Sequence, residues 1–186
     1  IILLSISSIA FGLELKNEEL VGVATGGNYV VAVGYTQSNT GVINVFTVNN
    51  GQLTLLKSIT LQGELYGVAY GNNQFMIVGT SGGAAFAAIY NGSFHQIKLP
   101  SDYTSLYSVA YGENEFMVGG STNSAGALGV YYDGAFRDDS SMLPSNMFAV
   151  TAITYGNGEF MVGGYISSGN YTYGELGEII NNSFSI

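Results

Sequence analysis

The sequence predicts an all-β protein built from four copies of one antiparallel unit, and three observations lead to this expectation. A motif that reads Val-Ala-Tyr-Gly-Asn-Asn-Gln-Phe-Met-Ile-Val-Gly in its second copy recurs about every 42 residues, starting at Val23, Val68, Val109 and Ile153. A second motif with its own turn signal follows every copy in the same order. The segments flanking these turns are short, apolar and β-prone, which favours strands over helices.

Within each unit, the first motif predicts a hairpin of two strands. In the second copy, residues 65–70 form the first strand, and residues 71–73 (Gly-Asn-Asn) supply the positive-φ positions of a tight turn. Residues 75–78 are a continuous apolar run that ends in Gly79, which is typical of a strand buried on both faces.

The second motif predicts two further strands joined by another hairpin. The third strand ends at an Asn-Gly, Asp-Gly or Asn-Asn turn, and a more polar fourth strand follows, such as residues 94–99. The copies of this motif are Val48–Leu53, Ile89–Phe94, Tyr131–Phe136 and Ile179–Phe184.

Four strands in about 42 residues are the size of one propeller blade, with buried inner strands and a polar outer strand. Over residues 20–186, the two motifs resemble the β-propeller repeats of many secreted and envelope proteins of bacteria and archaea. The resemblance implies blade architecture and no particular activity. We therefore expect a four-bladed β-propeller of four-stranded antiparallel blades within residues 11–186, with a β-sandwich, barrel or solenoid as alternatives. The expected repeats are about 20–62, 63–103, 104–146 and 147–186.

The last repeat is expected to lack its fourth strand, because only Ser185 and Ile186 follow Phe184. Residues 9–16 alternate between apolar and other side chains, which is strand periodicity. We expect this N-terminal strand to complete the last blade, close the ring and remove an exposed sheet edge. Alternatively, two chains together close an eight-bladed ring.

The N-terminal segment of residues 1–10 is apolar and too short to cross a membrane, which takes about 20 residues. Large apolar side chains gain roughly 1.5–3 kcal/mol each on full burial, so this segment should dock against something. One expectation is assembly, in which it adds as a strand or short helix to a neighbouring copy. The alternatives are capping of its own propeller and an uncleaved secretory signal. The expected assembly residues are Ile1, Ile2, Leu3, Leu4, Ile6, Ile9 and Phe11.

Composition excludes several classes of function. The 186 residues carry 13 acidic and 4 basic side chains, for a net charge of -9, so the chain cannot present a basic patch to nucleic acid. The absence of Cys and the single His leave no thiolate or multi-His metal site, and we expect no metal and no cofactor. Only 9% of residues are charged, against roughly 25% in an average soluble protein. A surface of Ser, Thr, Asn, Tyr and Gly favours an extracellular or cell-surface location, without a membrane span.

Three groups of titratable side chains deserve a functional test. His95 is expected to be an exposed strand residue, since no partner Ser or acid is placed beside it. The acidic cluster of Asp133, Asp138 and Asp139 could hold Ca²⁺, although its spacing fits a solvated connection between strands better. Glu115 and Glu159 occupy the same repeat position, so they should lie on one rim, farther apart than a glycosidase pair.

Tyrosine and asparagine provide the candidate binding and modification sites. Tyrosines outside the repeat positions could form a rim that binds glycans or proteins, as in Tyr-rich antibody sites. These are Tyr131, Tyr132, Tyr165, Tyr171 and Tyr173. Three Asn-x-Ser/Thr sequons make Asn91, Asn170 and Asn181 candidates for glycosylation in a secreted chain.

Together these features predict a non-enzymatic structural or adhesive protein of the cell surface or extracellular space. Its expected partners are copies of itself in an oligomer or filament, joined by the N-terminal segment, and also glycans or other envelope proteins. The alternative is a lectin-like module that binds glycans or proteins. A hydrolase on the same fold is the third hypothesis.

Overall fold

The computed structural model describes residue 15 and residues 17–168, 171–180 and 183–185. These residues form four four-stranded antiparallel sheets, each with its strands in chain order, so the expected all-β fold of four blades is confirmed. The first blade contains β1 (Glu18–Gly26), β2 (Tyr29–Thr36), β3 (Thr40–Asn49) and β4 (Gln52–Gln62). The second contains β5 (Leu65–Gly71), β6 (Gln74–Ser81), β7 (Ala84–Tyr90) and β8 (Phe94–Gln96).

The third and fourth blades repeat this order. The third contains β9 (Tyr103–Gly112), β10 (Glu115–Thr122), β11 (Gly126–Tyr132) and β12 (Ala135–Asp138), followed by the short 3₁₀ helix η1 (Ser140–Met142). The fourth contains β13 (Met147–Gly156), β14 (Glu159–Ser168), β15 (Tyr171–Ile180) and β16 (Ser183–Ser185). The predicted tight turns are present, since Asn72 and Asn73 have φ of 46° and 58° in the β5–β6 hairpin.

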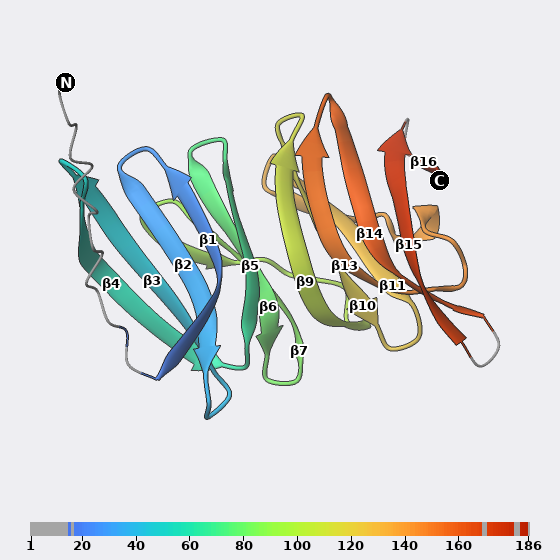
Figure 1. Ribbon diagram of the computed structural model, residues 1–186, viewed down its shortest axis with the longest axis horizontal. Helices are drawn as coiled ribbons and strands as arrows, with labels where there is room; N and C mark the ends of the chain where they lie inside the picture. Colours follow the sequence, from blue (N-terminus) through green and yellow to red (C-terminus); the bar gives the residue numbers. More distant parts are fainter. Residues whose placement is uncertain (1–14, 16, 169–170, 181–182, 186) are drawn as a thin grey trace, which may run out of the picture.

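The blades stand face to face in a row, and the first strand of each packs against the first strand of the next (Figure 1). Three hydrophobic clusters fill the spaces between consecutive blades. No cluster of the described residues joins the first blade to the last, and these two lie at opposite ends of the row in Figure 1. The described chain is thus an open arc of four blades, and the ring that we expected from the sequence is not closed by its first and last blades.

A contact between tyrosine and glycine recurs at every junction between blades. A Cβ atom added to Gly26 would overlap the ring of Tyr70 in the next blade. Gly71 has the same relation to Tyr111, and Gly112 to Tyr155. Each tyrosine therefore needs a residue without a side chain beneath it, which explains why the Tyr-Gly pair recurs in the sequence motif.

The last blade corrects one sequence prediction. Residues Ser183–Ser185 form β16, which pairs with β15, so the expectation that this blade lacks a fourth strand is wrong. All three residues pair with β15, and Phe184 lies directly opposite Ile179. The predicted N-terminal strand, residues 9–16, lies almost wholly outside the described residues.

Replacing Gly71 by Val should lower the free energy of unfolding by about 1–3 kcal/mol, because the new side chain would overlap the ring of Tyr111. Gly156 is the matched control, since a Cβ there meets nothing within 4 Å. Urea denaturation in dilute solution measures both. Equal losses for Gly71→Val and Gly156→Val would contradict the role of the tyrosine contact.

Candidate functional site

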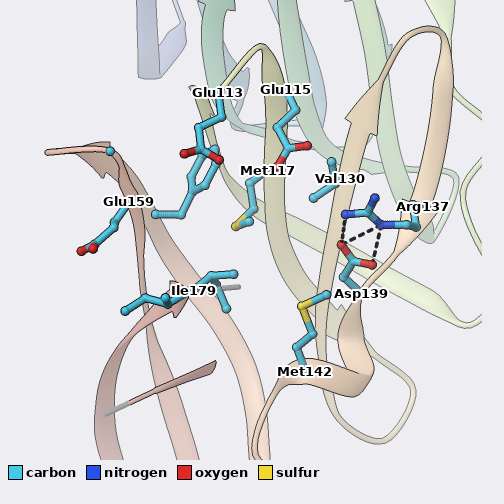
Figure 2. A pocket seen from close by; sticks show the side chains of 12 residues that line it. Glu113, Glu115, Met117, Val130, Arg137, Asp139, Met142, Glu159 and Ile179 are labelled. Atoms are coloured by element: carbon cyan, nitrogen blue, oxygen red, sulfur yellow. Dashed lines mark hydrogen bonds and ion pairs between the residues drawn. The ribbon is translucent and has the colours of Figure 1, made fainter. Parts of the chain in front are cut away.

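A pocket of about 300 Å³ opens between the third and fourth blades, at the end where the first hairpins of the blades turn (Figure 2). Its walls combine carboxylates with an apolar floor and one guanidinium group. The lining includes Glu113, Glu115, Met117, Val130, Arg137, Asp139, Met142, Glu159, Phe160 and Ile179.

The repeat itself brings the pocket's carboxylates together. Glu115 begins β10 and Glu159 begins β14, each directly after the same turn, so the prediction that they share a rim is confirmed. Glu113 lies in the β9–β10 turn at a φ of 50°. Both hairpins face one hollow because consecutive blades are stacked face to face.

Arg137 and Asp139 form an ion pair along one wall of the pocket (Figure 2). The guanidinium donates from Nε to Oδ1 of Asp139 at 2.8 Å and from an Nη nitrogen to Oδ2 at 2.8 Å. Asp139 is 6% exposed, whereas the side chain of Arg137 is 59% exposed. The hydrogen bond to Asp139 raises the pKa of Arg137. The ion pair places the guanidinium group of Arg137 in a pocket whose other charged groups are carboxylates.

Glu115 is the carboxyl group of this pocket whose ionisation is most affected. Its partial burial raises its pKa, and the nearby carboxylates of Glu113 and Asp139 act in the same direction. Arg137 opposes them. Glu115 therefore retains its proton to a higher pH than an exposed glutamate does, and can donate as well as accept a hydrogen bond in mild acid.

The remaining members of the predicted acidic cluster have structural contacts. Asp138 accepts hydrogen bonds from the hydroxyl of Tyr103 at 2.7 Å and from the backbone N–H of Ser140 at 3.0 Å. Burial acts to raise the pKa of Asp138, but these hydrogen bonds lower it overall. Asp133 occupies the β11–β12 turn at a φ of 49°. Asp138 and Asp139 thus hold the connection between β12 and η1, and Asp133 serves the preceding turn.

The remaining candidate residues are either exposed or outside the described residues. His95 is exposed, and its Nε2 lies 2.8 Å from the hydroxyl of Ser93. Asn91 is exposed in the β7–β8 hairpin, whereas Asn170 and Asn181 lie outside the described residues. Within the described chain, no group of three His, Asp or Glu side chains is arranged to hold a metal ion. The described residues also contain no helix that could span a membrane.

The candidate tyrosines do not form one rim. Tyr132 is 56% exposed beside half-buried Tyr131 in the third blade, while the other three belong to the fourth. There Tyr171 and Tyr173 are 69% and 50% exposed with ring centroids 6.3 Å apart. Tyr165 instead stacks on Phe148, at 5.5 Å. None of these tyrosines lines the acidic pocket.

A second candidate site is the outer face of the first blade, which we call the first end face (Leu20, Val21, Val23 and Thr25 of β1). Leu20 pairs with Gly34 as Leu65 pairs with Gly79, so the two leucines are equivalent. Leu20 is 44% exposed, whereas Leu65 is fully buried against the preceding blade. An apolar hollow of about 380 Å³, lined in part by Leu15, Leu20 and Val23, lies on this face.

The outer face of the fourth blade is the matching surface, which we call the last end face (Met161, Tyr165 and Leu176, with Gly156, Gly163 and Gly174). Leu176 pairs with Gly163 as Leu128 pairs with Gly119. Leu128 is fully buried, but Leu176 is 63% exposed. Each end of the row therefore exposes side chains that the inner junctions bury.

The assembly residues predicted from the sequence all lie outside the described residues; they are Ile1, Ile2, Leu3, Leu4, Ile6, Ile9 and Phe11. The sequence pattern did not reveal the end faces or the role of Arg137 in the pocket. The repeat alignment contained a usable signal, since Thr25 stands where the other copies have tyrosine. That signal becomes interpretable only in the structure, where no other blade of the described residues packs on β1 from its outer side.

Comparisons with solved structures support the fold. No family model and no curated protein matches the sequence. The computationally designed Ika4 protein matches at 18% identity and a TM-score of 0.59, over 88% of this chain and 93% of that one. A chain of the nidogen/laminin complex matches at 9% identity and a TM-score of 0.62, over 92% of this chain and 68% of that one. The fucose-specific lectin from Aleuria aurantia matches at 13% identity and a TM-score of 0.60, over 91% of this chain and 60% of that one. This chain therefore spans less than two thirds of the lectin's length. All are β-propellers, and these low identities show the propeller fold alone.

The raised pKa of Glu115 has a consequence for stability. A carboxyl group that binds its proton more tightly in the folded state makes stability fall as pH rises through its folded pKa. Glu115→Gln should therefore raise the free energy of unfolding at pH 7 and change it less at pH 4. Urea denaturation at both pH values tests this, and a gain of the same size at both would contradict the role of ionisation.

Proposed function

We propose that this chain is a non-enzymatic structural or adhesive protein of the cell surface or extracellular space, and that it assembles with copies of itself. The observation that carries the proposal is the exposure of apolar repeat positions at both ends of the row. Leu20 and Leu176 are 44% and 63% exposed, while their counterparts Leu65 and Leu128 are fully buried.

The energetics favour association through these faces. Full burial of one large aliphatic side chain is worth roughly 1.5–3 kcal/mol. The first end face carries three partly exposed ones, Leu20, Val21 and Val23, and the last carries Met161 and Leu176. Contiguous apolar surface of this kind marks interaction sites in soluble proteins. A few such side chains can offset the loss of translational and rotational freedom on binding, which is estimated at 4–15 kcal/mol.

The location and the lack of catalysis rest on other features. A chain in which only 9% of the residues are charged fits a medium outside the cell better than the cytosol. Asp138 and Asp139 are engaged in hydrogen bonds within the fold, and His95 is exposed rather than set in a cavity. Assembly through residues 1–10 stays a prediction, and it is compatible with contacts through the end faces.

Leu176→Glu should reduce self-association, because it places a charge in the centre of the last end face. Light scattering after size-exclusion chromatography, over a range of protein concentrations, measures the mass. Tyr132→Ser is the control, since it removes a 56% exposed aromatic side chain from a hairpin outside both end faces. A wild-type chain that stays monomeric at high concentration would refute the proposal.

Glycan binding is the second candidate function, and the pocket between the third and fourth blades favours it. Sugar hydroxyls donate to carboxylates such as Glu115 and Glu159, and the apolar face of a sugar ring can lie on side chains such as Met117. The lectin among the structural matches is described as fucose-specific, which makes fucose a first sugar to test.

If the pocket binds glycans, a glycan array should give signals that Glu115→Gln reduces severalfold and Tyr132→Ser leaves unchanged. The reduction is expected because the amide offers one acceptor oxygen where the carboxylate offers two. A wild-type array without any signal would exclude this function while leaving assembly intact.

A further inference from the structure

We propose that the first end face of one copy packs on the last end face of another, in the register of the junctions within the chain. In this contact Thr25 of one copy lies over Gly156 of the other, and Leu20 lies against Gly163. The inference rests on the proposed self-assembly and specifies its partner surfaces.

The inner junctions define the register. At the junction of the third and fourth blades, a Cβ added to Gly119 would stand 2.9 Å from Cβ of Val150 and 2.9 Å from Cδ1 of Ile153. Tyr155 covers Gly112 at the same junction. At this junction, three large residues on the first strand of the fourth blade, Val150, Ile153 and Tyr155, pack on glycines of the third blade.

The last end face repeats the receiving half of this junction. Gly156 is equivalent to Gly112, and a Cβ there meets nothing within 4 Å. Gly163 is equivalent to Gly119, and its Cβ would meet only atoms of its own blade, at 3.8 Å and beyond. Gly174 is also open, whereas its equivalent Gly126 is covered by Met147 of the next blade. Three receiving positions are therefore vacant together.

The first end face repeats the donating half. Leu20, Val23 and Thr25 are equivalent to Val150, Ile153 and Tyr155, and all three are exposed. Val23 is 66% exposed, whereas Ile153 is 9% exposed. These residues belong to β1, and in the inner junctions it is the first strand that approaches the preceding blade most closely.

A second aromatic contact agrees with this register. Tyr35 of the first blade lies 6.4 Å from Tyr66 of the second, ring centroid to centroid. Tyr165 is equivalent to Tyr35, and Val21 is equivalent to Tyr66. The proposed contact sets Val21, which is 44% exposed, against the ring of Tyr165.

On the outer face of the first blade, the exposed surface of the three inner strands is confined to β1, because Ala32, Val42, Asn44 and Phe46 of β2 and β3 are only 0–5% exposed. The side-chain amide of Asn44 on β3 donates to Glu18 at 2.7 Å, and Leu15 lines the adjacent hollow. Glu18 thus ties the start of β1 to β3, and Leu20, Val21 and Val23 are still 44–66% exposed with Leu15 beside them in the hollow.

Thr25 makes the contact weaker than an inner junction, because it replaces the tyrosine that covers glycine elsewhere. Thr25→Tyr should therefore tighten self-association, by roughly tenfold for a well-packed ring. A head-to-tail contact of this kind either closes a ring or continues as a filament. The mass of the assembly distinguishes the two.

The decisive experiment uses the absence of cysteine from the chain. Leu20→Cys and Gly163→Cys are made as separate proteins, mixed and oxidised mildly, because equivalent positions lie within reach of a disulfide at the inner junctions. A disulfide-linked pair should form in the mixture much faster than in a mixture of Gln37→Cys with Gly163→Cys. Gln37 is exposed in the β2–β3 turn, away from the proposed contact.

The outcomes separate this inference from the proposed function. Self-association without preferential cross-linking, or with no tightening by Thr25→Tyr, would overturn the register while assembly stands. Monomeric protein in every variant would overturn both, and would indicate that each chain covers its own end faces. Circular dichroism of the cysteine variants confirms that they are folded before they are mixed.

Discussion

The structure depends on one constraint, namely that each sheet is apolar on both faces and must be covered on both. The inner blades meet this requirement through their neighbours: in the second blade, Phe75 and Ile77 pack against the first blade, and Met76 and Val78 against the third. The tyrosine that rests on a bare glycine sets how closely and in which register consecutive blades approach. Any chain built in this way has two uncovered faces unless it closes on itself or meets another chain.

This constraint links the fold to the two candidate sites. Stacking brings the first hairpins of neighbouring blades to one rim, which creates the pocket with Glu115 and Glu159. The same stacking stops at the first and fourth blades, which leaves Leu20 and Leu176 exposed. The pocket therefore arises within a junction, and the end faces arise where a junction is missing.

The fold gives chemically similar acidic side chains different roles. Asp138 and Asp139 lie close together in sequence, but both have partners that hold the chain between β12 and η1. Glu115 has a raised pKa because burial and its acidic neighbours outweigh the attraction of Arg137. Asp139 also lines the pocket, but its carboxylate is engaged by Arg137.

The sequence alone determined the all-β class, the four repeats and their hairpins, because turn residues such as Asn72 and Asn73 and the apolar strands act locally. It also placed Glu115 and Glu159 on one rim, since a repeat carries equivalent residues to equivalent places. The tertiary structure decided that Ser183–Ser185 form β16 and that the first and last blades remain apart. The separation of the end blades depends on how the sheets stack, through many contacts such as Tyr70 on Gly26, and β16 depends on its pairing with β15; neither is encoded in a local pattern.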